Sequence, residues 1–169
     1  MDQSAVIMTN NAQPSARFRV LFVCTGNICR SPTAHAIFVR DVGRAGLAAQ
    51  IVVDSAGTSA WHAGEAADPR TVAAALRHGV DMGALRARPF QPQDWRQFDL
   101  ILVAGYDHLA QLRWQMPADW PGELALMLAD AEVPDPYYSG EAGFDAVFTL
   151  LEQASRHWLD KARAQLPAI

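Results

Sequence analysis

The chain has 169 residues and a mass of 18.5 kDa, which is the size of one ordinary domain with its own hydrophobic core. Half of the residues are hydrophobic and 19% are charged, a composition that excludes a disordered chain. The formal net charge of -4 gives no broad basic field, which argues against a nucleic-acid partner, and no apolar run is long enough for insertion into a membrane.

The N-terminal residues and the cysteine content bear on the compartment and on cofactors. Residues 1–16 have the composition of a flexible polar tail, followed by one domain over 17–169. The first residues lack the basic start and the apolar stretch of a secretory signal, so we expect a cytoplasmic protein. Cys24 and Cys29 are the two cysteines of the chain. Two are too few for a structural zinc site, and no metal or other cofactor is expected.

Apolar runs and helical periodicity alternate along the rest of the chain. In chain order, the pattern predicts a strand over 18–23, a helix from Ser31-Pro32 to about 43–46, a strand over 51–53, a helix from Asp68-Pro69 to Gly79, a short acidic turn over 93–97, a strand over 98–104, a helix over 106–116, a weaker strand over 124–128, a loop over 129–143 and a helix from 144 to about 165. Ser31 is expected to cap the first helix with its hydroxyl. Strands that alternate with helices predict a single-domain α/β fold, in which a four-stranded parallel sheet carries helices on both faces.

The loop after the first predicted strand, residues 24–30, has the features of a phosphate-binding loop. Successive backbone N–H groups in a tight loop form an anion-binding concavity, and the N-terminus of the following helix adds partial positive charge. Gly26 and Asn27 tolerate the left-handed backbone conformation that such a cradle needs. Arg30 adds a planar guanidinium that can hold two phosphate oxygens. Because ligands bind at the carboxyl edge of parallel sheets, we expect this loop to lie beside the loop that follows the fourth strand.

The chemistry of this loop centres on its first cysteine. The same N–H groups would stabilise a thiolate at Cys24, and Ser31 is placed to donate its hydroxyl to that sulfur. Cys24 would then be an ionised nucleophile that needs no histidine base. The alternative is a buried structural thiol. For Cys29 two interpretations remain open: packing inside the loop, and a reversible disulfide with Cys24 that protects the nucleophile from over-oxidation.

Residues 20–34, VLFVCTGNICRSPTA, resemble the signature of the low-molecular-weight protein tyrosine phosphatases. The likeness continues over 53–58, 68–70, 98–102 and 135–138, and therefore covers nearly all of the chain after the tail. The resemblance implies a small parallel sheet flanked by helices, and hydrolysis of phosphotyrosine through a cysteinyl-phosphate intermediate. It also implies a phosphotyrosine-containing protein as substrate, with a tyrosine kinase as a candidate partner. The protein is expected to be a monomer or a weak dimer.

Carried over position by position, the resemblance assigns the catalytic roles. It implies that Cys24 is the nucleophile, Arg30 the phosphate ligand and Asp135 the general acid and base. Displacement of a tyrosinate needs such an acid, and the prolines on both sides of Asp135 stiffen its loop. The remaining phosphate-binding positions of the loop are Thr25, Gly26, Asn27, Ile28 and Cys29.

Further positions of the family concern the support of the loop and the rim of the cleft. Asn27 and Ser55 resemble the pair whose side-chain hydrogen bonds hold the loop in shape. Ser31 matches the serine that supports the thiolate as leaving group in the second step. An aromatic-walled slot would favour a flat phenyl phosphate and leave phosphoserine too short to reach the thiolate. The aromatic positions of the rim are Trp61, Tyr137 and Tyr138.

The chain departs from the family's pattern at two places, and the role of a third residue is open. His35 stands where a glutamate is frequent, and we interpret it as a change on the surface of the first helix. His78 resembles a family histidine that supports the loop, although a histidine that caps a helix is an equal alternative. Residues 104–108, AGYDH, replace the usual Met-Asp after the third strand and make the segment one residue shorter, so no role is assigned to an aspartate there.

Two other enzyme activities and a binding function compete with this prediction. Arsenate reductases use the same fold, but their thioredoxin-coupled form needs further cysteines, and this chain has none beyond Cys29. Protein arginine phosphatases resemble this family but tend to carry threonine at the position of Ile28, so isoleucine favours phosphotyrosine. A module that only binds phosphotyrosine would not require Asp135.

Overall fold

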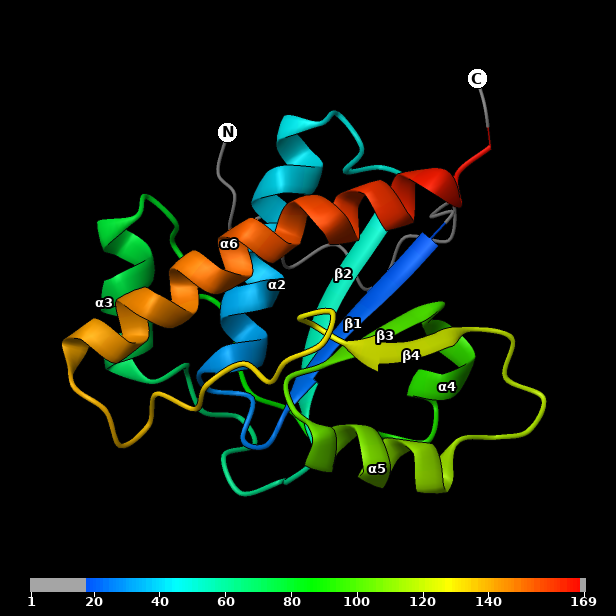
Figure 1. Ribbon diagram of the computed structural model, residues 1–169, viewed down its shortest axis with the longest axis horizontal. Coiled ribbons are helices and arrows are strands. Elements are labelled where there is room, and N and C mark those ends of the chain that lie inside the picture. The colour runs from blue at the N-terminus through cyan, green and yellow to red at the C-terminus, as the bar shows by residue number, and fades with distance from the viewer. Residues whose placement is uncertain (1–17, 168–169) are drawn as a thin grey trace.

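A computed structural model describes residues 18–167 of the chain (Figure 1). The expected tail over 1–16 lies outside the described residues. The elements are β1 (Phe18–Cys24), α2 (Arg30–Arg44), β2 (Ile51–Gly57), α3 (Pro69–Arg77), α4 (Asp94–Gln97), β3 (Leu100–Val103), α5 (Tyr106–Gln115), β4 (Glu123–Leu126) and α6 (Glu141–Ala164). The four strands pair in parallel in the order β2-β1-β3-β4, which confirms the predicted α/β fold.

Both faces of the sheet are covered by helices, because alternate residues of each strand point to opposite sides. Val20 and Phe22 of β1 belong to the core beneath α2 and α6, whereas Leu21 and Val23 belong to the core beneath α4 and α5 (Figure 1). Trp158 of α6 packs on Phe22 with ring centroids 4.8 Å apart. Its indole N–H donates to the carbonyl of Met127 at 2.8 Å, which ties α6 to the segment after β4.

The element boundaries differ from the sequence prediction where polar residues lie inside the sheet. The second strand continues beyond 53 to Gly57, because Asp54 and Ser55 pair with Leu21 and Phe22 of β1. Within the acidic turn expected over 93–97, residues 94–97 form a short helix, α4, because Trp95 is buried beneath the sheet. The last helix begins at Glu141, three residues earlier than predicted.

The position of β1 in the sheet decides where the site lies. β1 is flanked by β2 and β3, so the loop that follows it emerges at the middle of the carboxyl edge. The loops after β2 and β4 run to either side of it (Figure 1). Within the described residues, no helix has both the length and the apolar character required to cross a bilayer.

Candidate active site

The loop between β1 and α2 is held by hydrogen bonds to its carbonyl groups. The carbonyls of Cys24 and Thr25 accept from the amides of Thr58 and Ser59 at 2.8 and 3.0 Å. The carbonyl of Ile28 accepts from the amide of Asp68, the residue before α3, at 2.9 Å. In a trans peptide the N–H of the next residue points opposite to the carbonyl. The amides that follow these carbonyls are therefore turned away from the scaffold, as an anion cradle requires.

Of the two residues expected in the left-handed conformation, Gly26 and Asn27, Asn27 alone adopts it. Asn27 has a φ of 57°, and it is the one non-glycine residue with positive φ in the described chain. Its side-chain amide donates to Ser31 Oγ at 2.7 Å, and its Oδ1 accepts from the Arg88 amide at 3.0 Å. Gly26 has no left-handed φ and is needed for space, since a Cβ there would lie 3.0 Å from the His62 ring.

The sulfur of Cys24 lies against the first turn of α2. Its Sγ is 3.0 Å from Ser31 Oγ and accepts a weaker bond from the Ser31 amide at 3.4 Å. Asn27 donates to the same hydroxyl oxygen, so the one hydroxyl proton is shared between two acceptors, the sulfur and the Ala56 carbonyl at 3.3 Å. A thiolate at Cys24 is the stronger acceptor of the two, because it is charged. The Ser31 hydroxyl is therefore committed to the loop, and the expected helix cap by Ser31 is wrong: α2 begins at Arg30, without a side-chain cap.

Arg30 and Asp135 are placed together by loops that are far apart in the sequence. Arg30 is 8% exposed, and its guanidinium donates to the Val133 carbonyl at 3.4 Å. Its Nη2 lies 3.6 Å from Oδ2 of Asp135, whose side chain is half exposed. Oδ1 of Asp135 accepts from the Tyr137 amide at 3.1 Å, which orients the carboxyl group within the proline-flanked loop. A guanidinium and a carboxyl group thus face the same space.

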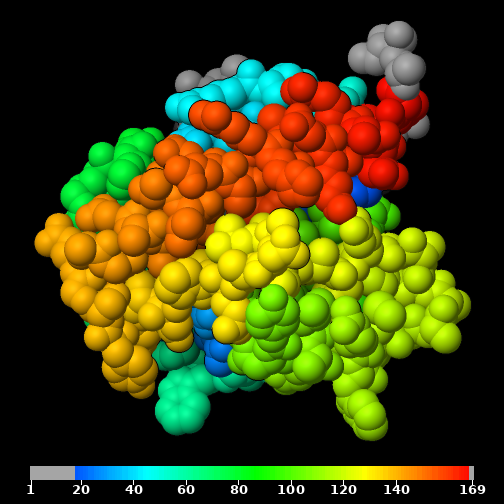
Figure 2. All heavy atoms as spheres, viewed as in Figure 1, coloured from blue at the N-terminus to red at the C-terminus, as the bar shows by residue number. Residues whose placement is uncertain are grey.

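That space is a cavity of about 350 Å³ above the loop. Figure 2 shows a small blue patch of early residues at the base of a hollow, between the orange segment that leads into α6 and the green surface of α5. Tyr138 and Trp61 are 94% and 85% exposed, and Tyr137 packs edge-on against Tyr138. The residues that line the cavity are Cys24, Thr25, Gly26, Ile28, Cys29, Arg30, Ser59, Trp61, His62, Asp135, Tyr137 and Tyr138.

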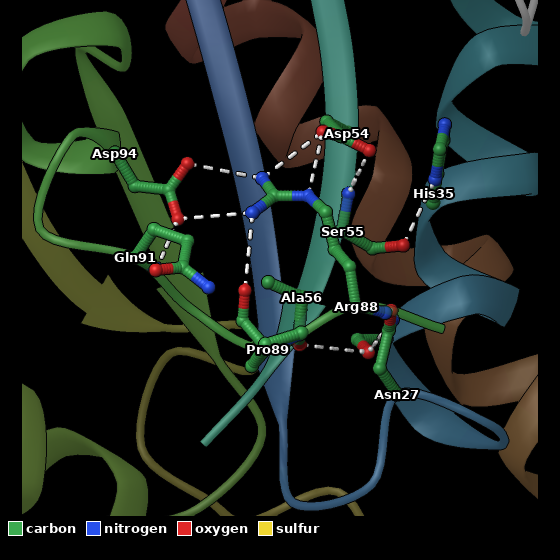
Figure 3. A network of polar contacts seen from close by, with 10 residues as sticks. Asn27, His35, Asp54, Ser55, Ala56, Arg88, Pro89, Gln91 and Asp94 are labelled. Carbon is green, nitrogen blue, oxygen red and sulfur yellow. Dashed lines mark hydrogen bonds and ion pairs between the residues drawn. The ribbon is translucent and has the colours of Figure 1, made fainter. Parts of the chain in front are cut away.

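The turn at Asn27 is backed by a partly buried charge cluster (Figure 3). Arg88 donates to both oxygens of Asp94 at 3.0 Å and lies 3.0 Å from Oδ2 of Asp54. These ion pairs fix the backbone of Arg88, whose amide holds Asn27 and whose carbonyl accepts from Gly57 at 2.8 Å. The sequence analysis missed Arg88, because its contribution to the loop is made through the backbone.

Asn27 and Ser55, the two residues expected to support the loop, make side-chain hydrogen bonds to different partners: Asn27 to Ser31, and Ser55 to a histidine of α2. The Oγ of Ser55 lies 3.0 Å from Nδ1 of His35, and this histidine is 3% exposed (Figure 3). The interpretation of His35 as a surface residue is therefore wrong: the face of α2 that carries it packs against β2. Burial lowers the pKa of His35 from 6.5 to about 4, and its Nε2 has no hydrogen-bond partner.

The buried His35 should make the stability of the fold depend on pH. The folded state keeps the ring neutral down to about pH 4, whereas the unfolded chain protonates it below its ordinary value of 6.5. The free energy of unfolding therefore falls by about 3 kcal/mol in all as the pH is lowered from 6.5 to about 4. Urea unfolding of the wild type and of His35→Gln at several pH values measures this loss. We expect the free energy of unfolding to decline clearly less with falling pH in His35→Gln than in the exposed control His157→Gln. Equal declines in the two variants would contradict this role of His35.

The sequence left two interpretations open for each of two residues, His78 and Cys29. His78 caps the C-terminus of α3 and stacks on Phe148 of α6, with Nε2 3.3 Å from Asp145, so the capping alternative describes it. Cys24 and Cys29 are both free thiols. Cys29 packs against Phe144, and burial raises the pKa of its thiol to about 12. A thiol with that pKa stays protonated at neutral pH and is a poor nucleophile.

The cavity also contains two residues that were not predicted from the sequence, Ser59 and His62. His62 lies beside Gly26 in the wall of the cavity, and its Nδ1 is 2.6 Å from Oε2 of Glu65. Its position directly after Trp61, in a predicted rim segment, is the signal that could have identified it.

Comparison with known proteins places this geometry in a family. Residues 19–168 match the family model described as low molecular weight phosphotyrosine protein phosphatase. The chain is 41% identical to a low molecular weight protein-tyrosine-phosphatase of Streptomyces coelicolor, over 88% of this chain and 96% of the relative. It superposes on the protein tyrosine phosphatase of Entamoeba histolytica, solved with Hepes in the active site, with a TM-score of 0.82, 33% identity, and coverage of 87% and 97%. A Drosophila arginine phosphatase superposes with a TM-score of 0.77 and 28% identity, over 84% and 96% of the two chains.

Proposed function

This chain belongs to the low molecular weight protein tyrosine phosphatases, and we propose that Cys24, Arg30 and Asp135 carry out its catalysis. The reaction is hydrolysis of phosphotyrosine through a cysteinyl phosphate. One observation carries the assignment: Cys24, Arg30 and Asp135 line one cavity, although Asp135 comes from the loop after β4 and the other two from the loop after β1. The arrangement contains a nucleophile, a phosphate clamp and a proton donor.

In the first step Cys24 attacks the phosphorus atom of phosphotyrosine. The loop amides and Arg30 hold the three non-bridging oxygens, whose negative charge they balance as the P–O bond to tyrosine breaks. Asp135, protonated at this stage, gives its proton to the departing phenolic oxygen. Its half-exposed position at the mouth of the cavity supports this role, because the leaving group must point outward. The products are cysteinyl phosphate and free tyrosine.

In the second step water replaces the sulfur at phosphorus. The Asp135 carboxylate, formed in the first step, removes a proton from water as its oxygen attacks. The S–P bond breaks and Cys24 leaves as a thiolate. The Ser31 hydroxyl, 3.0 Å from the sulfur, stabilises that negative charge by donating its proton in a hydrogen bond. Inorganic phosphate is released, and the thiolate is ready for another cycle.

The rim supports a phenyl phosphate as the substrate. Trp61 and Tyr138 project far into solvent on the border of the cavity and offer flat faces to an aromatic ring. Ile28 contributes an apolar residue to the lining of the cavity, where the related arginine phosphatases tend to have threonine. We propose that the substrate is a phosphotyrosine-containing protein in the cytoplasm. A tyrosine kinase is one candidate for this substrate.

Turnover on a panel of substrates tests this function. In the presence of EDTA, the protein is expected to release phosphate from phosphotyrosine peptides and from p-nitrophenyl phosphate. Its kcat/KM for a phosphoarginine peptide of the same sequence is expected to be lower by at least about 100-fold, because the apolar Ile28 leaves the charged guanidinium without a partner. An Ile28→Thr variant is the matched control and should narrow the gap. Preference for phosphoarginine, or arsenate reduction with thioredoxin, would contradict the proposal.

A further inference from the structure

The start of α5 carries a buried histidine that has no part in the chemistry proposed above. His108 is 1% exposed and lies in the segment 104–108, where the sequence departs from its family. Its Nδ1 accepts from the Gly105 amide at 3.0 Å, so the neutral ring carries its proton on Nε2. Nε2 lies 2.7 Å from Oγ1 of Thr25, the first loop residue after the nucleophile. His108 is therefore a hydrogen-bond donor to the phosphate-binding loop.

The oxygen that His108 holds is also bonded to the phosphate clamp. Oγ1 of Thr25 accepts from Nη2 of Arg30 at 3.5 Å, while Nη1 of Arg30 donates to the Val133 carbonyl at 3.4 Å. Two donors, one from α5 and one from α2, thus converge on one threonine oxygen. If Nε2 of His108 did not fix this oxygen, the exposed Thr25 side chain could rotate away from Arg30.

The neutral state of His108 is maintained by its surroundings. Burial, and to a smaller extent Arg30, lower the pKa of His108 below its ordinary value, against the opposing effect of Asp107, Glu132 and Asp135. Oδ1 of Asp107 lies 3.5 Å from Nδ1, the atom that already accepts from Gly105. At neutral pH the ring therefore keeps one donor and one acceptor, and both are used.

We propose that His108 is a positioning residue for this reaction: by holding Oγ1 of Thr25, it fixes the guanidinium of Arg30 in the orientation that receives the phosphate. The inference rests on the proposed role of Arg30 as phosphate ligand. His108 does not line the cavity and touches no reacting atom, so its effect reaches the substrate through Thr25 and Arg30. The same helix start meets the loop that carries Asp135, because the Tyr106 amide donates to Oε2 of Glu132 at 3.0 Å.

Three variants of the full chain test this positioning role. His108→Ala removes the donor, Thr25→Val removes the acceptor, and His108→Gln keeps an amide donor near the position of Nε2. We expect His108→Ala and Thr25→Val each to weaken the binding of inorganic phosphate by about tenfold, the effect of one hydrogen bond that orients a charged group. Their kcat/KM should fall by a similar factor for good and for poor leaving groups alike. His108→Gln should recover most of this loss.

The double variant and a surface control separate positioning from general damage. The variant with both Thr25→Val and His108→Ala is expected to bind phosphate no more weakly than either single variant, because the two act through one contact. His157→Gln, on the exposed face of α6, should match the wild type. Wild-type phosphate affinity in Thr25→Val, or additive losses in the double variant, would overturn the inference even if His108→Ala fails to fold. A wild-type protein that neither binds phosphate nor hydrolyses phosphotyrosine would instead overturn the proposed function.

Discussion

Replacement of Cys24 by serine is expected to abolish turnover while the phosphate site persists. A serine hydroxyl is not ionised at neutral pH, so the attacking atom loses its negative charge although the loop keeps its shape. The loss of kcat should reach at least about 10⁴-fold, since removal of a catalytic nucleophile has cost an enzyme on the order of 10⁶-fold. Steady-state hydrolysis of p-nitrophenyl phosphate measures it. Binding of inorganic phosphate by calorimetry should remain within about threefold of the wild type, because the amides and Arg30 are unchanged.

The second cysteine provides the matched comparison for this variant. Cys29 is buried against Phe144, and its raised pKa keeps it a thiol, so Cys29→Ser should retain far more activity than Cys24→Ser. If the two variants lost activity equally, or if Cys24→Ser kept a tenth of the wild-type rate, Cys24 would not be the nucleophile.

Replacement of Asp135 by asparagine is expected to slow the reaction in proportion to the difficulty of the leaving group. Asparagine keeps the shape of the side chain but has no proton to give to a departing phenolate. For phenyl phosphate or phosphotyrosine, kcat/KM should fall by about 10²- to 10⁴-fold, the usual contribution of a general acid. For a dinitrophenyl phosphate, whose leaving group needs no proton, the loss should be less than about tenfold. We choose kcat/KM because it reports the steps up to release of the phenolate and excludes hydrolysis of the intermediate.

The outcome that would contradict this role is an equal loss for both leaving groups. Asp135 also lies 3.6 Å from Arg30, so a uniform loss would mean that its contribution is to orient the guanidinium. Phosphate affinity of the Asp135→Asn variant distinguishes the two cases, because an acid that acts only on the leaving group leaves product binding nearly unchanged.

The fold could be predicted from the sequence because its strands and helices obey local rules. The apolar strand over 18–23 and the helices after it have clear periodicity, and parallel strands joined by helices allow few topologies. Boundaries were wrong where polar residues enter the sheet. Asp54 and Ser55 look like the end of a strand, yet they stay in β2 because Arg88 and His35 satisfy their side chains inside the protein.

Most residues that line the cavity were predictable, Ser59 and His62 excepted, but the residues that support them were not. Cys24 and Arg30 share one short motif, which local sequence reveals directly. The supports of the loop come from distant segments: His108 follows β3, and Arg88 precedes α4. Nothing in the local sequence shows which backbone amide will meet Asn27 or which hydroxyl a histidine will hold, because those contacts depend on how the chain folds back.

Identification of the phosphorylated residue shows whether Cys24 is the nucleophile. The protein is mixed for a few milliseconds with a dinitrophenyl phosphate, whose leaving group needs no proton from Asp135, and is then quenched in acid, digested and analysed by mass spectrometry. We expect one phosphoryl group on the peptide that contains Cys24 and Cys29, and fragmentation of this peptide should locate the group on Cys24. The phosphorylated enzyme should accumulate further in the Asp135→Asn variant, because that side chain cannot activate water. A phosphoryl group on Cys29 or on a histidine, or full turnover with no phosphorylated enzyme at any time point, would contradict this assignment.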